Sequence, residues 1–210
     1  MKIVFLGDSI TDAGRNSTHY MPNFKLGYGY VFLLKSALSK KDPLKYEVVN
    51  VGISGNRIVD LLARIKRDVW NENPDVISIL VGVNDVWHEI QNQNGVEIDR
   101  FEKYYRDIIE ETKKRFPACK LMMLEPFVLE GEATQGKYNE FLEVKEYAKV
   151  VRKLASEYEI PLVELQEEFD RLSEKYGVRP LLWDGVHPDV YGATVIADKW
   201  MEVFNKEIDN

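Results

Sequence analysis

Residues 2–12 read KIVFLGDSITD, an apolar run that ends in a Gly-Asp-Ser turn. The part Lys2–Leu6 has the length and composition of a buried strand. A tight turn directly after a strand exposes the Ser9 hydroxyl at the strand end and points the Ser9 N–H into the same space. The ordinary alternative is that Ser9 caps a helix after the strand. The stretch therefore predicts the first strand of an α/β fold, with a candidate nucleophile at its carboxyl end.

The rest of the chain alternates short apolar runs with longer stretches of helical period, which is the pattern of βαβ units and a parallel sheet. Further strands are expected at Glu47–Val51, Val76–Val81, Lys120–Leu124 and Pro161–Val163. Five parallel strands with helices on both faces make a three-layer α/β/α sandwich around a flavodoxin-like sheet. No repeat, low-complexity tract or linker interrupts residues 1–210, so we expect a single domain.

Apolar residues at i, i+3, i+4 and i+7 mark the helices between these strands. The clearest stripe runs from Phe101 to Phe116, and similar stripes cover Phe141–Tyr158 and Ala193–Phe204. Tyr30–Leu38 and Ile58–Val69 fill the first two crossovers. The pattern therefore predicts a helix in each crossover and one that closes the chain.

Composition limits the function classes. The net charge is −7, and phosphate binding needs a basic face, so a nucleic-acid partner is not expected. The single cysteine, Cys119, cannot form an internal disulfide. No apolar stretch reaches membrane-spanning length, and the first one is too short for a signal peptide. We expect a cytoplasmic protein that binds no membrane.

Polar clusters follow the predicted strands. Residues 50–56 (NVGISGN) follow the second strand, and residues 82–85 (GVND) follow the third. The segment DGVHP, residues 184–188, lies beyond the fifth strand and a further helix. Ligands of doubly wound sheets bind outside the carboxyl ends of the strands. We therefore expect these clusters to meet Ser9 at one rim of the sheet.

Asp184 and His187 are the most informative of these residues. An aspartate three positions before a histidine on a short loop can accept the Nδ1 proton, which leaves Nε2 free to accept the proton of a serine. Pro188 stiffens this loop and Gly185 lets it turn. The alternative is an Asp/Pro turn that leads into the last helix. The spacing favours a nucleophilic site made of Ser9, His187 and Asp184.

Asn84 and Gly55 are candidates for stabilising a developing negative charge. The Asn84 amide could join the N–H groups of Ser9 and Gly55 around an oxyanion. Each residue also has an ordinary interpretation, Asn84 as a turn residue and Gly55 as a position that needs positive φ. Their placement after the second and third strands favours the oxyanion role.

Each candidate cofactor or metal motif in the sequence lacks a residue that the motif requires. Residues 131–137 have P-loop spacing, but Tyr138 stands where a serine or threonine must reach Mg²⁺. Residues 27–29 (GYG) lack the third glycine of a dinucleotide fingerprint. The acidic residues and the histidine within residues 85–89 have no further histidine or cysteine at a spacing that suits a metal. No cofactor and no metal are therefore expected.

Four blocks in this order resemble the SGNH hydrolase (GDSL esterase/lipase) superfamily: GDSI around Ser9, ISGN around Gly55, GVND around Asn84, and D-x-x-HP at Asp184 and His187. The blocks span nearly the whole chain. The resemblance implies that Ser9 is the nucleophile, His187 the base and Asp184 its orienting acid. It also implies an oxyanion hole made by the Ser9 N–H, the Gly55 N–H and the Asn84 side chain, on an α/β/α fold.

Further residues are similar to those of the bacterial acetylxylan esterases in that superfamily. They are DAGR at 12–15, GYGYV at 27–31, VNDVW at 83–87, EPF at 125–127 and Trp183. Those enzymes remove acetyl groups from xylose units, and oligomers occur among them. The resemblance implies a serine esterase for short-chain acetyl esters whose partner is a small-molecule or oligosaccharide ester, and it allows a homo-oligomer.

Aromatic side chains near the predicted rim are candidate substrate contacts. Tyr20, Tyr28, Trp87 and Trp183 could stack on sugar rings, with core or lid packing as the alternative. Asp8, beside the nucleophile, is a further candidate contact. No long apolar loop of the kind that holds an acyl chain is evident, which favours short acyl groups.

Two other functions stay open. A lysophospholipase or thioesterase of the same superfamily would use the same site residues on a different ester. A catalytically silent binding domain could use the same flavodoxin-like sheet. The complete set of candidate site residues counts against the silent domain.

Overall fold

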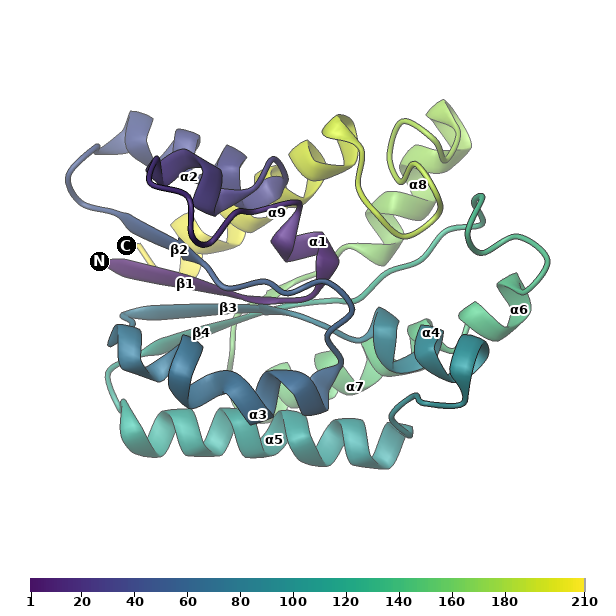
Figure 1. Cartoon of the computed structure of the whole chain (residues 1–210), viewed down its shortest axis with the longest axis horizontal. Helices are drawn as coiled ribbons and strands as arrows, with labels where there is room; N and C mark the ends of the chain where they lie inside the picture. Colours follow the sequence, from purple (N-terminus) through teal and green to yellow (C-terminus); the bar gives the residue numbers. More distant parts are fainter. Residues whose placement is uncertain (210) are drawn as a thin grey trace.

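The computed structural model of the protein describes residues 1–209 and has a five-stranded parallel sheet as its middle layer (Figure 1). The strands are β1 (Lys2–Gly7), β2 (Glu47–Asn50), β3 (Val76–Leu80), β4 (Lys120–Leu124) and β5 (Leu162–Val163). Their order is β2-β1-β3-β4-β5, which is the flavodoxin-like order. The predicted fold class is confirmed, and each predicted strand lies within one residue of the observed bounds.

Helices cover both faces of this sheet (Figure 1). One face carries α2 (Tyr30–Lys41), α8 (Gln166–Tyr176) and α9 (Val190–Glu207). The other carries α3 (Ile58–Asp68), α5 (Ile98–Arg115) and α7 (Val144–Glu157). Shorter elements are α1 (Ser9–Asp12), α4 (Val83–Asn92), α6 (Tyr138–Phe141) and 3₁₀ turns at Pro22–Leu26 and Trp70–Glu72.

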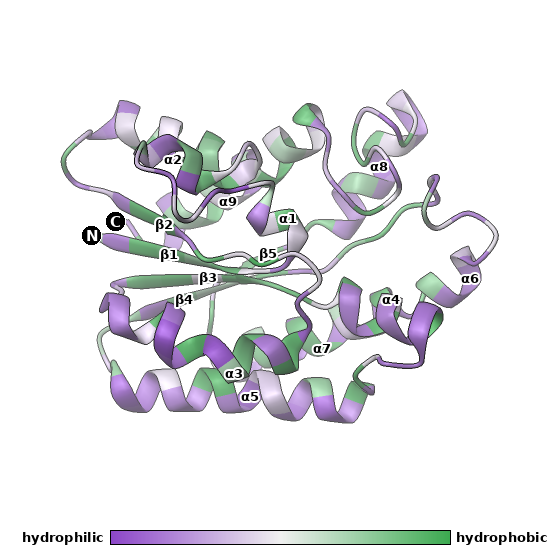
Figure 2. Cartoon of the chain, viewed as in Figure 1, coloured by the Kyte–Doolittle hydropathy of each residue, from purple (hydrophilic) through white to green (hydrophobic). Residues whose placement is uncertain are grey.

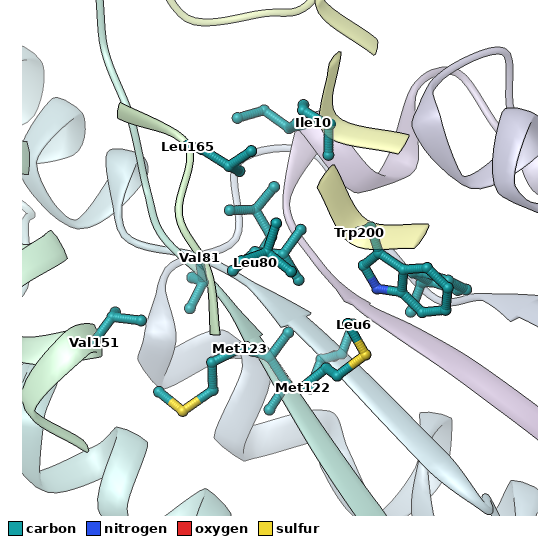
Figure 3. Packing of buried hydrophobic residues seen from close by; sticks show 14 of the residues in the cluster. Leu6, Ile10, Leu80, Val81, Met122, Met123, Val151, Leu165 and Trp200 are labelled. Atoms are coloured by element: carbon teal, nitrogen blue, oxygen red, sulfur yellow. The ribbon is translucent and has the colours of Figure 1, made fainter. Parts of the chain in front are cut away.

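The central strands are buried on both sides, which explains their nearly continuous apolar sequences. Figure 2 shows β1, β3 and β4 mostly in hydrophobic colours, and the long helices with mixed ones. In the core, Val151 of α7 lies beside Met123 of β4, away from Trp200 of α9 (Figure 3). The Trp200 indole N–H donates to the buried hydroxyl of Ser78 at 2.9 Å. The sheet is thus packed between two helical layers, and the loops that follow the strands begin at its carboxyl rim.

Two helical segments differ from the expectation. The polar cluster after β3 does not form a turn, because α4 begins at Val83 and continues through it. Val83, Val86 and Ile90 follow the helical period, but polar residues between them obscure the stripe in so short a helix. The helix expected over Phe141–Tyr158 is divided, since α6 ends at Phe141 and α7 begins at Val144.

Candidate active site

Ser9 lies at the carboxyl end of β1, as the first residue of α1. Asp8 caps this helix, and its Oδ1 accepts the Ile10 N–H at 3.0 Å. The turn is tight, because a Cβ on Gly7 would lie 2.6 Å from the carbonyl oxygen of Leu80 in β3. Since Asp8 provides the cap, the Ser9 hydroxyl is left for another partner.

That partner is a histidine from the far end of the chain. Ser9 Oγ lies 2.9 Å from His187 Nε2, and His187 Nδ1 lies 2.7 Å from Asp184 Oδ2. A carboxylate only accepts hydrogen bonds, so Nδ1 carries the ring proton and Nε2 accepts from Ser9. The structure therefore joins the three expected residues in one hydrogen-bonded series.

Asp184 is almost fully buried. Its Oδ1 accepts the backbone N–H groups of Val186 at 2.9 Å and of His187 at 2.8 Å. Burial by itself would raise the pKa of this carboxyl, but the His187 ring and the two backbone N–H groups hold the pKa below its usual range. The carboxylate is therefore ionised at neutral pH and holds the imidazole in one tautomer.

The loop that carries Asp184 packs against residues 129–134. The Leu129 N–H donates to the Gly185 carbonyl at 2.9 Å, and the Ala133 N–H donates to the Asp184 carbonyl at 2.8 Å. A Cβ on Gly131 would lie 2.4 Å from the Gly185 nitrogen. From the sequence, the stretch between Phe127 and Tyr138 was a candidate for shaping the pocket, but its contact with the Asp184 loop was not predicted. Its glycine spacing was noted only as a rejected P-loop pattern.

A cavity of about 410 Å³ opens at Ser9 and His187. Ser54, Tyr28 and Trp183 form part of its wall. The Trp183 ring stacks on the His187 ring, with centroids 5.9 Å apart and an interplanar angle of 19°. The Ser9 hydroxyl is therefore accessible from a space large enough for a small ligand.

The expected oxyanion donors lie on two segments that touch. Asn84 is in the first turn of α4, and its Nδ2 donates to the Asn56 carbonyl at 3.1 Å. An amide has two hydrogens, so this bond leaves one for another acceptor. Gly55 has a φ of +80°, a conformation that favours glycine. The structure links the two residues through Asn56, although neither is part of the cavity wall.

The aromatic candidates fall into two groups. Tyr28 and Trp183 line the cavity and are 79% and 49% exposed. Trp87 instead packs beside the His187 ring, with centroids 5.8 Å apart, and lies outside the cavity wall. Tyr20 is also outside that wall. Tyr28 and Trp183 are therefore the two that a ligand in the cavity would meet.

The structure does not bring Asp8 to the cavity. Its carboxyl is buried beneath the turn, its Oδ2 has no hydrogen-bond partner, and burial raises its pKa to about 7. Asp85 of α4 is similar, since its Oδ1 accepts the Ile58 N–H at 3.0 Å while its Oδ2 has no partner. Burial raises the pKa of Asp85 well above the usual range. Both carboxyls are buried beneath the site, and neither residue lines the cavity.

Within residues 1–209, no three His, Cys, Asp or Glu side chains are grouped so that they could hold a metal ion. No helix in that range has the length and apolar composition needed to cross a membrane.

A hydroxyl, an imidazole and a carboxylate in hydrogen-bonded series are typical of serine hydrolases. The sequence model of the GDSL-like lipase/acylhydrolase family matches residues 5–195, and the chain belongs to this family. The protein is a carboxylic ester hydrolase. The superfamily predicted from the four sequence blocks is confirmed.

Several relatives share most of the chain. An acetylxylan esterase from Geobacillus stearothermophilus is 36% identical over 203 residues, which is 93% of this chain and 90% of the relative. The crystal structure of Axe2, an acetylxylan esterase from the same organism, has a TM-score of 0.85 and 34% identity, and the match covers 96% of this chain and 93% of that one. A GDSL-like lipase from Parabacteroides merdae has a TM-score of 0.90 and 35% identity, with 97% and 95% covered. The expected similarity to acetylxylan esterases is therefore confirmed.

Proposed function

We propose that the protein is a serine esterase that hydrolyses short-chain esters, and in particular removes acetyl groups from xylo-oligosaccharides or related carbohydrates. The observation that carries this proposal is the hydrogen-bonded series from Ser9 through His187 to Asp184, at the mouth of a cavity. Similarity in sequence and in structure to acetylxylan esterase from Geobacillus stearothermophilus, over most of the chain, supports the substrate class.

In this mechanism Ser9 is the nucleophile. Its Oγ attacks the ester carbonyl carbon while His187 Nε2 takes the hydroxyl proton, and Asp184 stabilises the imidazolium that forms. His187 then gives this proton to the leaving alcohol oxygen as the ester C–O bond breaks, which leaves the acetyl group on Ser9. A water molecule attacks the acyl-enzyme, gives its proton to His187, and acetic acid leaves as the Ser9 hydroxyl is restored.

Three donors are proposed to hold the oxyanion of each tetrahedral intermediate: the N–H groups of Ser9 and Gly55 and the Asn84 amide. The hydrogen bond from Asn84 to the Asn56 carbonyl supports this role, because it anchors the amide beside the segment that carries Gly55. Donors fixed before the reaction stabilise the developing charge without reorganisation, which makes such holes effective.

The cavity supports a small acyl group on a sugar. Its volume of about 410 Å³ lies near the lower end of the range for ligand pockets, and small residues such as Ala13, Gly14 and Gly29 form part of the wall. The exposed rings of Tyr28 and Trp183 at this wall are suited to stacking on the apolar face of a pyranose ring.

The first test is Ser9→Ala. We expect acetate release from p-nitrophenyl acetate and from acetylated xylo-oligosaccharides to fall by roughly 10³-fold or more, with an unchanged melting temperature. Ser54→Ala is the matched control, because it removes a hydroxyl from the same cavity wall outside the hydrogen-bonded series. A Ser9→Ala variant with kcat within a few-fold of wild type would exclude Ser9 as the nucleophile.

The second test identifies the acyl group and the alcohol of the ester that the enzyme prefers. Turnover is measured on p-nitrophenyl esters of increasing chain length, on acyl-CoA, on lysophospholipids and on acetylated sugars. We expect the maximum at the acetyl ester and the highest kcat/KM on acetylated xylo-oligosaccharides. A maximum at C8 or beyond, or a preference for lysophospholipid or acyl-CoA, overturns the acetyl-carbohydrate assignment while leaving the esterase mechanism in place.

A further inference from the structure

Arg64 of α3 is a buried arginine whose side chain reaches the rim of the sheet, and it is only 8% exposed. Its Nη2 donates to the Gly7 carbonyl at 3.0 Å, and its Nη1 donates to the Val51 carbonyl at 2.7 Å. Its Nε donates to Asn56 Oδ1 at 2.6 Å. One guanidinium therefore binds the end of β1, the chain just after β2 and the segment beyond it.

These acceptors flank the groups that the reaction needs. Gly7 is two residues before Ser9 in the chain, and Val51 and Asn56 enclose the segment that contains Gly55. The carbonyl of Asn56 in turn accepts the Asn84 amide at 3.1 Å. The contacts of Arg64 thus extend, directly or through one residue, to the three segments that carry the proposed oxyanion donors.

We propose that Arg64 is a positioning residue that sets the distances among the Ser9 turn, the Gly55 segment and the Asn84 amide; this inference rests on the proposed esterase mechanism. The guanidinium is planar and its donors have fixed directions, so it holds several acceptors in one geometry. A lysine at this site carries one compact charge and cannot reproduce three such contacts.

A purely structural role for Arg64 would come from its ion pair with Asp68, which Nη1 contacts at 3.0 Å. Asp68 lies four residues along the same helix and also binds Arg67, and no contact of its carboxylate reaches a strand end in the structure of residues 1–209. The two roles are separable, because removing the charge of Asp68 leaves the three rim contacts of Arg64 in place.

The experiment compares Arg64→Lys with the control Asp68→Asn, using p-nitrophenyl acetate and phenylboronic acid. A boronic acid forms a tetrahedral adduct on a serine hydroxyl, so its affinity reports the oxyanion geometry. For Arg64→Lys we expect kcat to fall about 10- to 100-fold with KM within a few-fold of wild type, because small misplacements of reacting groups are costly. The affinity for phenylboronic acid should fall in parallel. Asp68→Asn should lower the melting temperature and leave kcat within about threefold.

Asn56→Ala provides a second variant if Arg64→Lys does not fold. It removes the Nε contact at a half-buried position, and we expect a smaller loss of kcat with KM unchanged. The positioning role is overturned if folded Arg64→Lys or Asn56→Ala keeps the kcat of wild type. It is also overturned if Asp68→Asn loses as much kcat as Arg64→Lys does. An inactive Ser9→Ala together with a fully active Arg64→Lys overturns this inference alone, whereas an active Ser9→Ala overturns the proposed function.

Discussion

Two halves of the site are held by different kinds of contact. The nucleophile half is the set of segments that follow β1, β2 and β3, where the side chain of Asp8 caps the turn after β1 and that of Arg64 binds the carbonyls of Gly7 and Val51. The acid–base half is the loop 183–188, whose carbonyls accept backbone N–H groups from residues 129–133. The supports of the first half should therefore respond to changes of polar side chains, and the supports of the second half to changes of backbone fit.

The backbone fit of the acid–base half depends on two glycines. A Cβ on Gly131 would lie 2.4 Å from the Gly185 nitrogen, and a Cβ on Gly185 would lie 2.6 Å from the Leu129 carbonyl oxygen. Gly185 also has a φ of +99°. Thr134 braces the segment, because its Oγ1 accepts the Gly131 N–H and donates to the Leu129 carbonyl, each at 2.8 Å. Side chains at the two glycine positions would force these two loop segments apart.

The largest loss of kcat is expected from replacing the carboxylate of the acid–base half. Asp184→Asn removes the acceptor that fixes the His187 tautomer, and kcat should fall by about 10⁴-fold, as the same change does in a Ser-His-Asp protease. Steady-state kinetics on p-nitrophenyl acetate measure this loss. Asp189→Asn is the control, because Asp189 lines the same cavity and its asparagine variant still caps α9. A kcat within tenfold of wild type in Asp184→Asn would remove Asp184 from the mechanism.

A smaller effect is expected from Asn84, the proposed oxyanion donor of the nucleophile half. Asn84→Ala should lower kcat by about 10²- to 10³-fold, the usual cost of losing one such donor. KM should change little, because the donor acts on charge that develops in the transition state. Asn92→Ala, at the exposed end of the same helix, is the control. If both variants lose activity equally, the loss comes from α4 and not from the amide.

Backbone fit should matter less than either group that acts in the reaction. Gly131→Ala pushes a Cβ against the main chain of the acid–base half, and we expect kcat to fall by about tenfold as Asp184 and His187 shift. Gly136→Ala is the control in the same segment, because its Cβ would meet nothing within 4 Å although its φ of +81° is strained for alanine. The comparison of the halves fails if Gly136→Ala lowers kcat as much as Gly131→Ala does.

Much of the molecule could be predicted from local signals. Apolar runs located the strands to within one residue, because buried parallel strands have a distinctive composition. The rule that ligands bind at the carboxyl rim predicted that Ser9 and His187 would meet, and their side chains lie 2.9 Å apart. Helix α4 was missed because its polar motif suggested a turn, although its apolar residues have helical spacing.

The supports of the site could not be predicted in the same way. Arg64 lies on an amphipathic helix with other charged residues, and no local pattern shows that its guanidinium turns inward to three acceptors. Gly131 and Thr134 act on a loop about fifty residues away through main-chain contacts, which leave little trace in sequence. Asp8 was expected to contact substrate because it adjoins Ser9, yet adjacency in a chain does not determine burial.

The last effect concerns the pH dependence of stability, and its sign differs between the two halves. Burial raises the pKa of Asp8 to about 7 from its usual 3.8, so the folded protein keeps a proton that the unfolded chain releases. Stability therefore falls as pH rises between about 4 and 7. Asp8→Asn removes this loss, so its free energy of unfolding relative to wild type should increase over that window, by on the order of a few kcal/mol at most.

Asp184 should give the opposite trend. Its pKa is held below the usual range, so it stabilises the fold at neutral pH, and this contribution disappears as pH falls below about 4. The deficit of Asp184→Asn relative to wild type should therefore shrink in acid, while the advantage of Asp8→Asn also shrinks there. Urea unfolding at several pH values measures both differences, and titrations of other groups cancel in each. If the free energies of unfolding of Asp8→Asn and wild type stay parallel from about pH 4 to 8, ionisation of Asp8 does not destabilise the fold. The predicted difference in sign between Asp8 and Asp184 would then be wrong.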